Sequence, residues 1–173
     1  MKYIPFLVLL LISILITSAM LLKKDDNNIQ NYIIGTKISE FELPSLYEKD
    51  DKFHSKIFHS NGWKVLNVFA SWCQQCKSEH KYLKKLSKII PLYGIAYNDN
   101  PIKTKRFLDK MGNVYSSVGI DEHGNNAVLI GISGIPETYL IDGQGIIRFK
   151  YLGALDDKVL DDYIIPIIEE KKD

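Results

Sequence analysis

Residues 65–76 read VLNVFASWCQQC and contain both cysteines of this 173-residue chain. The first six residues are mostly apolar and predict a buried strand, because such a run suits a strand that is covered on both faces. After the cysteines, apolar residues recur at steps of three and four as far as Pro91. This spacing predicts a helix over residues 73–90 that the proline ends. The stretch therefore predicts a strand that leads directly into a helix, with Cys73 and Cys76 at the junction.

The spacing of the two cysteines predicts a redox-active pair. Residues three apart on a helix lie on one face, so the two sulfur atoms can bond. Cys73 lies at the expected helix N-terminus, where free N–H groups and the helix dipole favour thiolate over thiol. We therefore predict that Cys73 is the nucleophile. Cys76 lies one turn further along and suits the resolving cysteine, which attacks a mixed disulfide and releases the partner.

Three other uses of the cysteines compete with this interpretation. Two buried structural thiols would not need to lie at a strand–helix junction. A metal site formed by Cys73, Cys76 and His80 lacks a fourth ligand, and the chain has no second C-x-x-C sequence. A c-type haem attachment site requires histidine directly after the second cysteine, where Lys77 stands. The haem site is excluded, whereas the structural and metal interpretations stay open.

The rest of the chain predicts an α/β architecture. Strands are expected over residues 92–97, 137–141 and 146–151, the last two joined by a hairpin turn. Helices are expected over residues 103–111 and from Asp156 onward, the second limited or kinked by Pro166. Strands and helices in this order indicate a sandwich with a mixed central sheet flanked by helices.

Composition indicates one soluble domain behind an apolar N-terminus. Hydrophobic residues make up 46% of the chain and charged residues 25%, which excludes a disordered chain and a disulfide framework. The net charge of +1 provides no basic field for nucleic acid, so no nucleic acid partner is expected. We expect a membrane segment at residues 1–22, a polar linker at 23–32 and a folded domain at 33–173.

The apolar segment is expected to be one transmembrane helix that stays attached to the chain. Residues 4–22 are 19 residues without a charge, and at about 1.5 Å per residue they nearly span a hydrocarbon core of about 30 Å. The alternative is a cleaved signal peptide, since Thr17-Ser18-Ala19 resembles a weak cleavage site. Lys2 precedes the segment and Lys23 and Lys24 follow it, so the basic residues leave its orientation open.

The strand, the Trp-Cys-x-x-Cys sequence and the helix together resemble the thioredoxin superfamily. A second motif, Gly134-Ile135-Pro136-Glu137-Thr138, precedes an expected strand far away in the sequence. The resemblance implies that Pro136 follows a cis peptide bond and packs against the active-site disulfide, and such bonds usually mark specific turns. The alternative is an ordinary proline at the start of a strand.

Two longer blocks are similar to one branch of that superfamily. Residues 65–81 and 134–148 resemble the CcmG/DsbE family of cytochrome c maturation thioredoxins, and so does the N-terminal membrane segment. The resemblance implies a single-pass protein of the bacterial inner membrane whose thioredoxin-like domain faces the periplasm. It implies a dithiol reductant for apocytochrome c or its haem-ligation partner, recharged by a membrane electron donor of the DsbD/CcdA type. It implies no cofactor beyond the Cys73–Cys76 pair.

Further candidates surround the cysteines. Glu79 falls on the core-facing side of the expected helix, where desolvation would raise its pKa and make it a proton acceptor for Cys76; a solvated first-turn glutamate is the alternative. Glu137 is expected beside the disulfide, in contact with the partner protein, or else as an exposed strand residue. Trp72 is expected to shield the site and contact partners, or else to pack in the core.

Two more residues bear on the chemistry. Asn67 stands where thioredoxins typically carry a buried aspartate, which is consistent with proton handling by Glu79 instead. His80 is expected on the helix surface.

Three alternative functions remain at this point. A general periplasmic disulfide reductase would differ only in its partners. A copper-binding metallochaperone would use the dithiol to hold the metal. A thiol peroxidase needs threonine and proline before its first cysteine, and Ala70-Ser71-Trp72 does not supply them.

Overall fold

The computed structural model describes residues 3–21 and 33–170, which belong to two separate units. In the first unit, the residues expected to cross a membrane form helix α1 (Ile4–Leu21). Among the described residues, however, no helix combines the length and the apolar character that a membrane crossing needs. The linker expected at 23–32 lies outside the described residues.

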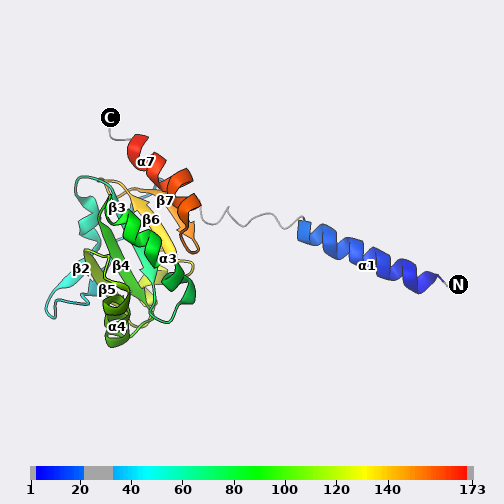
Figure 1. The fold of residues 1–173 in the computed structure, drawn as a ribbon, viewed down its shortest axis with the longest axis horizontal. Helices are drawn as coiled ribbons and strands as arrows, with labels where there is room; N and C mark the ends of the chain where they lie inside the picture. The colour runs from blue at the N-terminus through cyan, green and yellow to red at the C-terminus, as the bar shows by residue number, and fades with distance from the viewer. Residues whose placement is uncertain (1–2, 22–32, 171–173) are drawn as a thin grey trace. The chain divides into compact units, whose positions relative to one another are not determined.

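A mixed five-stranded sheet forms the centre of the second unit (Figure 1). Its strands are β3 (Lys64–Phe69), β4 (Leu92–Tyr97), β5 (Ser117–Asp121), β6 (Glu137–Ile141) and β7 (Ile147–Leu152). They lie in the order β5-β4-β3-β6-β7, with β3, β4 and β5 parallel and with β6 and β7 antiparallel to their neighbours. The predicted α/β sandwich with a mixed sheet is therefore confirmed.

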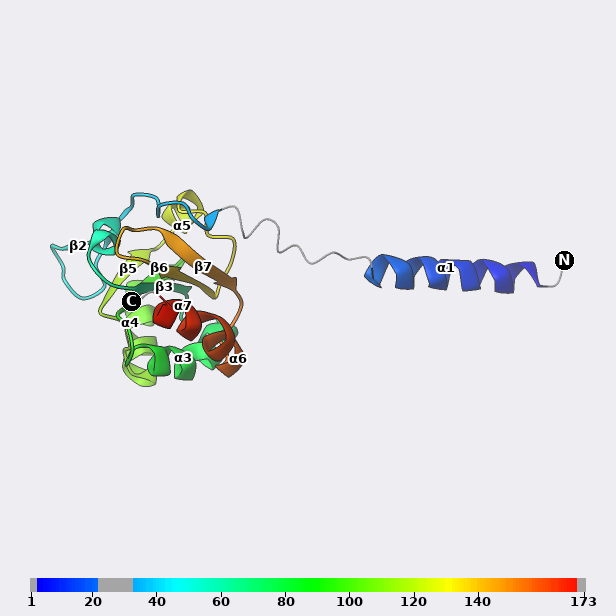
Figure 2. The same ribbon diagram turned by 90° about the horizontal axis from the view of Figure 1, so that it is seen from above.

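Helices cover one face of this sheet (Figure 2). They are α3 (Gln74–Leu86), α4 (Pro101–Met111) and a C-terminal series of α6 (Asp157–Val159), a π-helical turn (Leu160–Ile164) and α7 (Ile165–Glu170). They pack on inward-facing apolar residues of β3 such as Val65 and Phe69. The π-helical turn lies directly before Pro166, whose missing N–H group interrupts the regular hydrogen-bond ladder.

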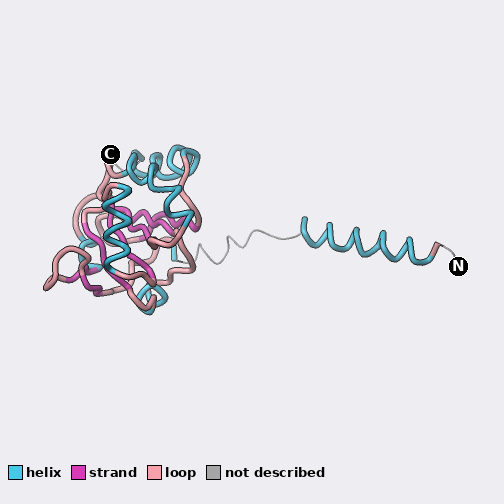
Figure 3. Tube along the Cα trace, turned by 60° about the horizontal axis from the view of Figure 1, so that its bottom comes forward, coloured by secondary structure: helices cyan, strands magenta, loops and turns pink. Residues whose placement is uncertain are grey.

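Smaller elements cover the opposite face. They are the antiparallel hairpin of β1 (Glu42–Pro44) and β2 (Lys52–His54), the 3-10 helix η2 (Ser55–His59) and α5 (Asn125–Leu129). Phe53 and Phe58 pack there on Leu66 and Val68 of β3. Figure 3 shows the strands of the sheet with helices and loops around them. β3 is thus buried on both faces, as its apolar run predicts.

Several element boundaries differ from the predictions. The β1–β2 hairpin, β5 and α5 were not predicted; each hairpin strand has three residues, and β5 and α5 have five each. Helix α3 ends at Leu86 instead of residue 90, and the N–H groups of Ile89 and Ile90 both donate to the carbonyl oxygen of Leu86 in a turn that precedes Pro91. Helix α4 begins two residues early, at Pro101, because a proline at the first helical position loses no hydrogen bond.

The register of the sheet places one polar residue in an apolar row. Asn67 of β3 pairs with Gly94 of β4 on one side and with Thr138 of β6 on the other. Paired residues of neighbouring strands share a face of the sheet. Asn67 therefore points to the face that α3 covers, between Val65 and Phe69.

Candidate active site

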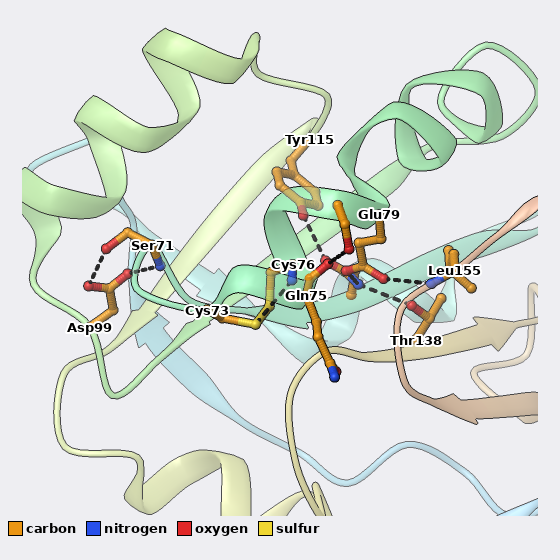
Figure 4. The surroundings of a disulfide bond; sticks show 11 residues. Ser71, Cys73, Gln75, Cys76, Glu79, Asp99, Tyr115, Thr138 and Leu155 are labelled. Atoms are coloured by element: carbon orange, nitrogen blue, oxygen red, sulfur yellow. Dashed lines mark hydrogen bonds between the residues drawn. A yellow bond between two sulfur atoms is a disulfide. The ribbon is translucent and has the colours of Figure 1, made fainter.

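The two cysteines form a disulfide at the N-terminus of α3 (Figure 4). Cys73 is the N-cap residue, and its Sγ accepts a hydrogen bond from the N–H group of Cys76 at 3.1 Å. Cys73 is 7% exposed and Cys76 only 2%. Because a partner must reach sulfur from solvent, Cys73 is the accessible end of the bond. The bond excludes two unreactive structural thiols as the state of this pair.

A buried carboxylate fixes the loop before the disulfide. Asp99 accepts hydrogen bonds from the N–H group and the Oγ of Ser71 at 2.6 and 2.9 Å, and from Oγ1 of Thr104 at 2.9 Å.

The indole N–H of Trp72 donates to the carbonyl oxygen of Asn98 at 3.1 Å. Trp72 is nevertheless 56% exposed, so the alternative that it packs in the core is wrong. Its ring lies in solvent directly before Cys73.

Glu79 is buried on the inner face of α3, one turn beyond Cys76. Its Oε1 accepts a hydrogen bond from Nδ2 of Asn67 at 3.0 Å, and its Oε2 accepts one from the N–H group of Leu155 at 3.1 Å. Burial raises the pKa of Glu79 to about 7, although both hydrogen bonds favour the ionised form and oppose the rise. The alternative of a solvated glutamate is wrong. A carboxyl group with such a pKa can both take and release a proton near neutral pH.

Pro136 has the backbone conformation that was expected for it. The peptide bond between Ile135 and Pro136 is cis, as the resemblance implied, and Pro136 is buried. The carbonyl oxygen of Pro136 accepts a hydrogen bond from the N–H group of Gly153 at 2.9 Å, which ties the start of β6 to the end of β7.

Glu137 does not lie on the surface. Its carboxylate is fully buried: Oε1 pairs with Nζ of Lys150 at 2.7 Å, and Ser133 donates to both oxygens from its Oγ and its N–H group, at 2.8 and 3.0 Å. Contact with a partner protein and an exposed strand position both require an accessible side chain, so the structure corrects both expectations. A carboxylate is tolerated here because a lysine of the neighbouring strand compensates its charge.

His80 is also buried, not on the helix surface as expected. Its Nε2 lies 2.7 Å from the carbonyl oxygen of Gly112, and the edge of its ring packs against Phe107 of α4. These contacts turn the ring towards α4. Within the described parts of the chain, no group of three or more histidine, cysteine and acidic side chains is placed to hold a metal ion.

Several residues of the site were not identified from the sequence. The position of Asp99 in the sequence indicated it only weakly: it follows the carboxyl end of a parallel strand, where functional groups often lie. Thr138 belongs to the motif around Pro136, but its contact with Asn67 depends on strand register. Tyr115 and Lys150 had no local signal, since their partners lie 48 and 13 residues away in the sequence.

Comparisons with known proteins agree with this geometry. Residues 34–150 match the model of the AhpC/TSA family. The chain is 36% identical to the thiol:disulfide interchange protein DsbE of Pasteurella multocida, with 97% of this chain and 94% of that protein covered. It is 35% identical to DsbE of Escherichia coli K12, with 84% of this chain and 80% of that protein covered.

Solved structures show the same fold at lower identity. A secreted thiol-disulfide isomerase from Corynebacterium glutamicum superposes with a TM-score of 0.65 at 20% identity, covering 76% of this chain and 85% of that chain. A DsbF homologue from Corynebacterium diphtheriae superposes equally well, with a TM-score of 0.65 at 20% identity, covering 75% of this chain and 85% of that chain.

Proposed function

The chain belongs to the AhpC/TSA family and to the DsbE (CcmG) thiol:disulfide interchange proteins, and we propose that it reduces apocytochrome c, or its haem-ligation partner, during cytochrome c maturation. Its general activity is that of a thiol-disulfide oxidoreductase, and the disulfide at the N-terminus of α3 is the observation that carries this conclusion. The narrower role is supported by the resemblance of residues 65–81 and 134–148 to cytochrome c maturation thioredoxins.

The first step of the reaction joins the protein to its partner. In the reduced protein, the Cys73 thiolate attacks one sulfur atom of a partner disulfide. The bond between the two partner sulfurs breaks, a mixed disulfide with Cys73 forms, and the other partner sulfur leaves as a thiolate. Trp72 lies in solvent beside this bond and contacts the bound partner.

The second step releases the partner. Cys76 gives its proton to the Glu79 carboxylate, and its sulfur attacks Sγ of Cys73. The Cys73–Cys76 disulfide forms, the mixed disulfide breaks, and the partner sulfur leaves as a thiolate that takes up a proton. Two electrons pass from the dithiol to the partner. A membrane electron donor of the DsbD/CcdA type then reduces the disulfide again.

The N-terminal segment holds the protein at the inner membrane, with the folded domain in the periplasm. The support comes from the sequence: residues 4–22 carry no charge, and haem attachment to apocytochrome c places the partner in the periplasm. After cell fractionation, the full-length chain is expected in membranes that resist high-salt washing. A variant that keeps only residues 1–3 and 23–173 is expected in the soluble fraction, and equal distribution of both forms would contradict the anchor.

Trapping tests the proposed partner. Replacing Cys76 by serine removes the resolving thiol, so the mixed disulfide with Cys73 is expected to accumulate in cells. Non-reducing electrophoresis should show a disulfide-linked complex that a reducing agent separates into its two proteins. Mass spectrometry should identify the partner in this complex as apocytochrome c or a haem-ligation protein.

The matched control replaces both Cys73 and Cys76 by serine and is expected to capture nothing. A strain that carries this double variant should also lose mature cytochrome c. Normal cytochrome c in that strain, together with a broad set of unrelated proteins captured by Cys76→Ser, would instead indicate a general disulfide reductase.

A further inference from the structure

The buried amide group of Asn67 forms a polar cluster with its hydrogen-bond partners Glu79, Thr138 and Tyr115, and Figure 4 shows these three partners beside the disulfide. Its Nδ2 donates one hydrogen bond to Oε1 of Glu79 and one to Oγ1 of Thr138, both at 3.0 Å. Its Oδ1 accepts a hydrogen bond from the hydroxyl group of Tyr115 at 2.7 Å. Both donors of the amide and its acceptor are therefore in use.

Tyr115 reaches Asn67 because β4, the strand between them, has a glycine at the position that faces them. Gly94 of β4 pairs with Asn67, and a Cβ atom there would lie 2.9 Å from the Phe69 ring and 3.3 Å from the Tyr115 ring. In the space that Gly94 leaves, the rings of Tyr115 and Phe69 stack with their centroids 4.9 Å apart. The packing holds the phenol in place, and its hydroxyl group points at the amide oxygen.

The hydrogen-bonding capacities of these groups fix the orientation of the amide. An ionised carboxylate only accepts hydrogen bonds, so it requires the NH₂ group of Asn67 and is repelled by the amide oxygen. The amide can be turned either way by shape alone. The Glu79 carboxylate thus selects the orientation in which Nδ2 faces it, and the Tyr115 hydroxyl, which donates to Oδ1 in that orientation, polarises the amide and strengthens the hydrogen bond that Nδ2 donates. If the hydroxyl group were removed, Oδ1 would be a buried oxygen without a donor, and the amide would be held less firmly and would donate more weakly to Glu79.

We propose that Tyr115 is a positioning residue for disulfide exchange: its hydroxyl group holds and polarises the Asn67 amide, which donates to the Glu79 carboxylate. The inference rests on the proposed role of Glu79 as the proton acceptor for Cys76. Tyr115 acts on Glu79 through two hydrogen bonds in series.

Few other groups can set the ionisation of Glu79. On its own helix, Cys76 lies one turn away and His80 is turned towards α4. From the other elements, Tyr115 is the titratable side chain of the cluster, and burial and the neighbouring Glu79 raise its pKa well above the usual value, so it stays a neutral donor. No ion pair joins Glu79 to a lysine, arginine or histidine of the described residues.

The test separates the two steps of exchange. Reduced full-length protein is mixed with a symmetrical aromatic disulfide that releases one coloured thiolate when Cys73 attacks and a second when Cys76 resolves. In Tyr115→Phe, the pH midpoint of the second phase is expected to rise by up to about one unit, which is the effect of losing one hydrogen bond to a charged group completely. At pH 7 this corresponds to a second phase that is up to about fivefold slower. The first phase is expected to keep its rate.

Two control variants make the result specific. Tyr93 of β4 is the neighbour of Gly94 in the chain and lies on the opposite face of the sheet. Tyr93→Phe therefore removes a phenol hydroxyl away from the cluster and is expected to leave both phases unchanged. Glu79→Gln is expected to abolish the pH inflection of the second phase. If Glu79→Gln kept the wild-type profile, the proposed role of Glu79 would fail and the inference with it. If only Tyr115→Phe kept that profile, or slowed both phases equally at every pH, the inference alone would be overturned.

A second pair of measurements covers the case in which rates are hard to interpret. Asn67→Leu removes the amide at similar size, and adding Tyr115→Phe to it is expected to cause no further shift, because Tyr115 acts through Asn67. The infrared C=O band of protonated Glu79, isolated by subtracting the Glu79→Gln spectrum, is expected to persist to higher pH in Tyr115→Phe. The inference would be overturned if the shifts in pH midpoint of Asn67→Leu and Tyr115→Phe added up in the double variant, or if the C=O band of Glu79 titrated as in the wild type.

Discussion

Replacement of Lys150 by methionine is expected to lower the free energy of unfolding by about 3–5 kcal/mol, the usual cost of removing one partner of a buried ion pair. The loss should be this large because both side chains are almost completely buried, and Glu137 would lose its compensating cation and retain only the two Ser133 donors. Denaturant unfolding of the full-length, oxidised chain at pH 7 measures the effect.

An exposed ion pair provides the matched control. Lys85 pairs with Asp157 while both side chains stay 60% exposed, so Lys85→Met should cost only about 0–1 kcal/mol. Adding Glu137→Gln to Lys150→Met should recover part of the loss, since no uncompensated charge then remains. Equal losses at positions 150 and 85 would show that the buried pair contributes no more than a surface pair.

The stability of the oxidised protein is expected to fall with rising pH because of Glu79. Its pKa is about 7 in the folded state and 4.5 without burial, so between these values the folded state holds a proton that the unfolded state has lost. Raising the pH through this window therefore favours unfolding, by about 3 kcal/mol in total at 1.36 kcal/mol per unit. Below the window both states are protonated, and above it both are ionised, so this contribution no longer changes.

Glu79→Gln isolates this effect, because its side chain resembles the protonated acid and does not titrate. The free energies of unfolding of wild type and variant, measured from pH 4 to 8 with the disulfide intact, should diverge across the window in favour of the variant. All other titrating groups cancel in the difference. Parallel curves would show that the carboxyl group is not held neutral by burial.

The residues that sequence reasoning placed correctly share one property: their structure is decided by neighbours in the chain. The buried β3 strand, the pair Cys73 and Cys76 at the start of α3, and the inward position of Glu79 all follow from local periodicity. The cis bond before Pro136 followed from a resemblance, and composition alone would not have predicted it.

The residues placed wrongly are decided by contacts across the sheet. A glutamate after a proline is normally predicted to be exposed. Glu137 can be buried because the antiparallel pairing of β6 with β7 brings Lys150 close enough to compensate its charge. His80 likewise depends on α4 for its partner. Asn67 was recognised as standing in place of an acid, but its hydrogen bonds depend on the pairing of β3 with β6, which brings Thr138 close, and on the segment before β5, which carries Tyr115.

The Asp99 carboxylate has a consequence for partner selection. It holds the Ser71 loop before any partner arrives, with hydrogen bonds from Ser71, Thr104 and the Asn100 N–H group. The conformational entropy of this loop is thus lost during folding and not during association, which is preorganisation. A rigid receptor leaves the adjustment of shape to the other molecule. Under the proposed function, chains that are still unfolded can make that adjustment, whereas compact proteins would first have to open locally, so a preorganised loop suits an unfolded partner.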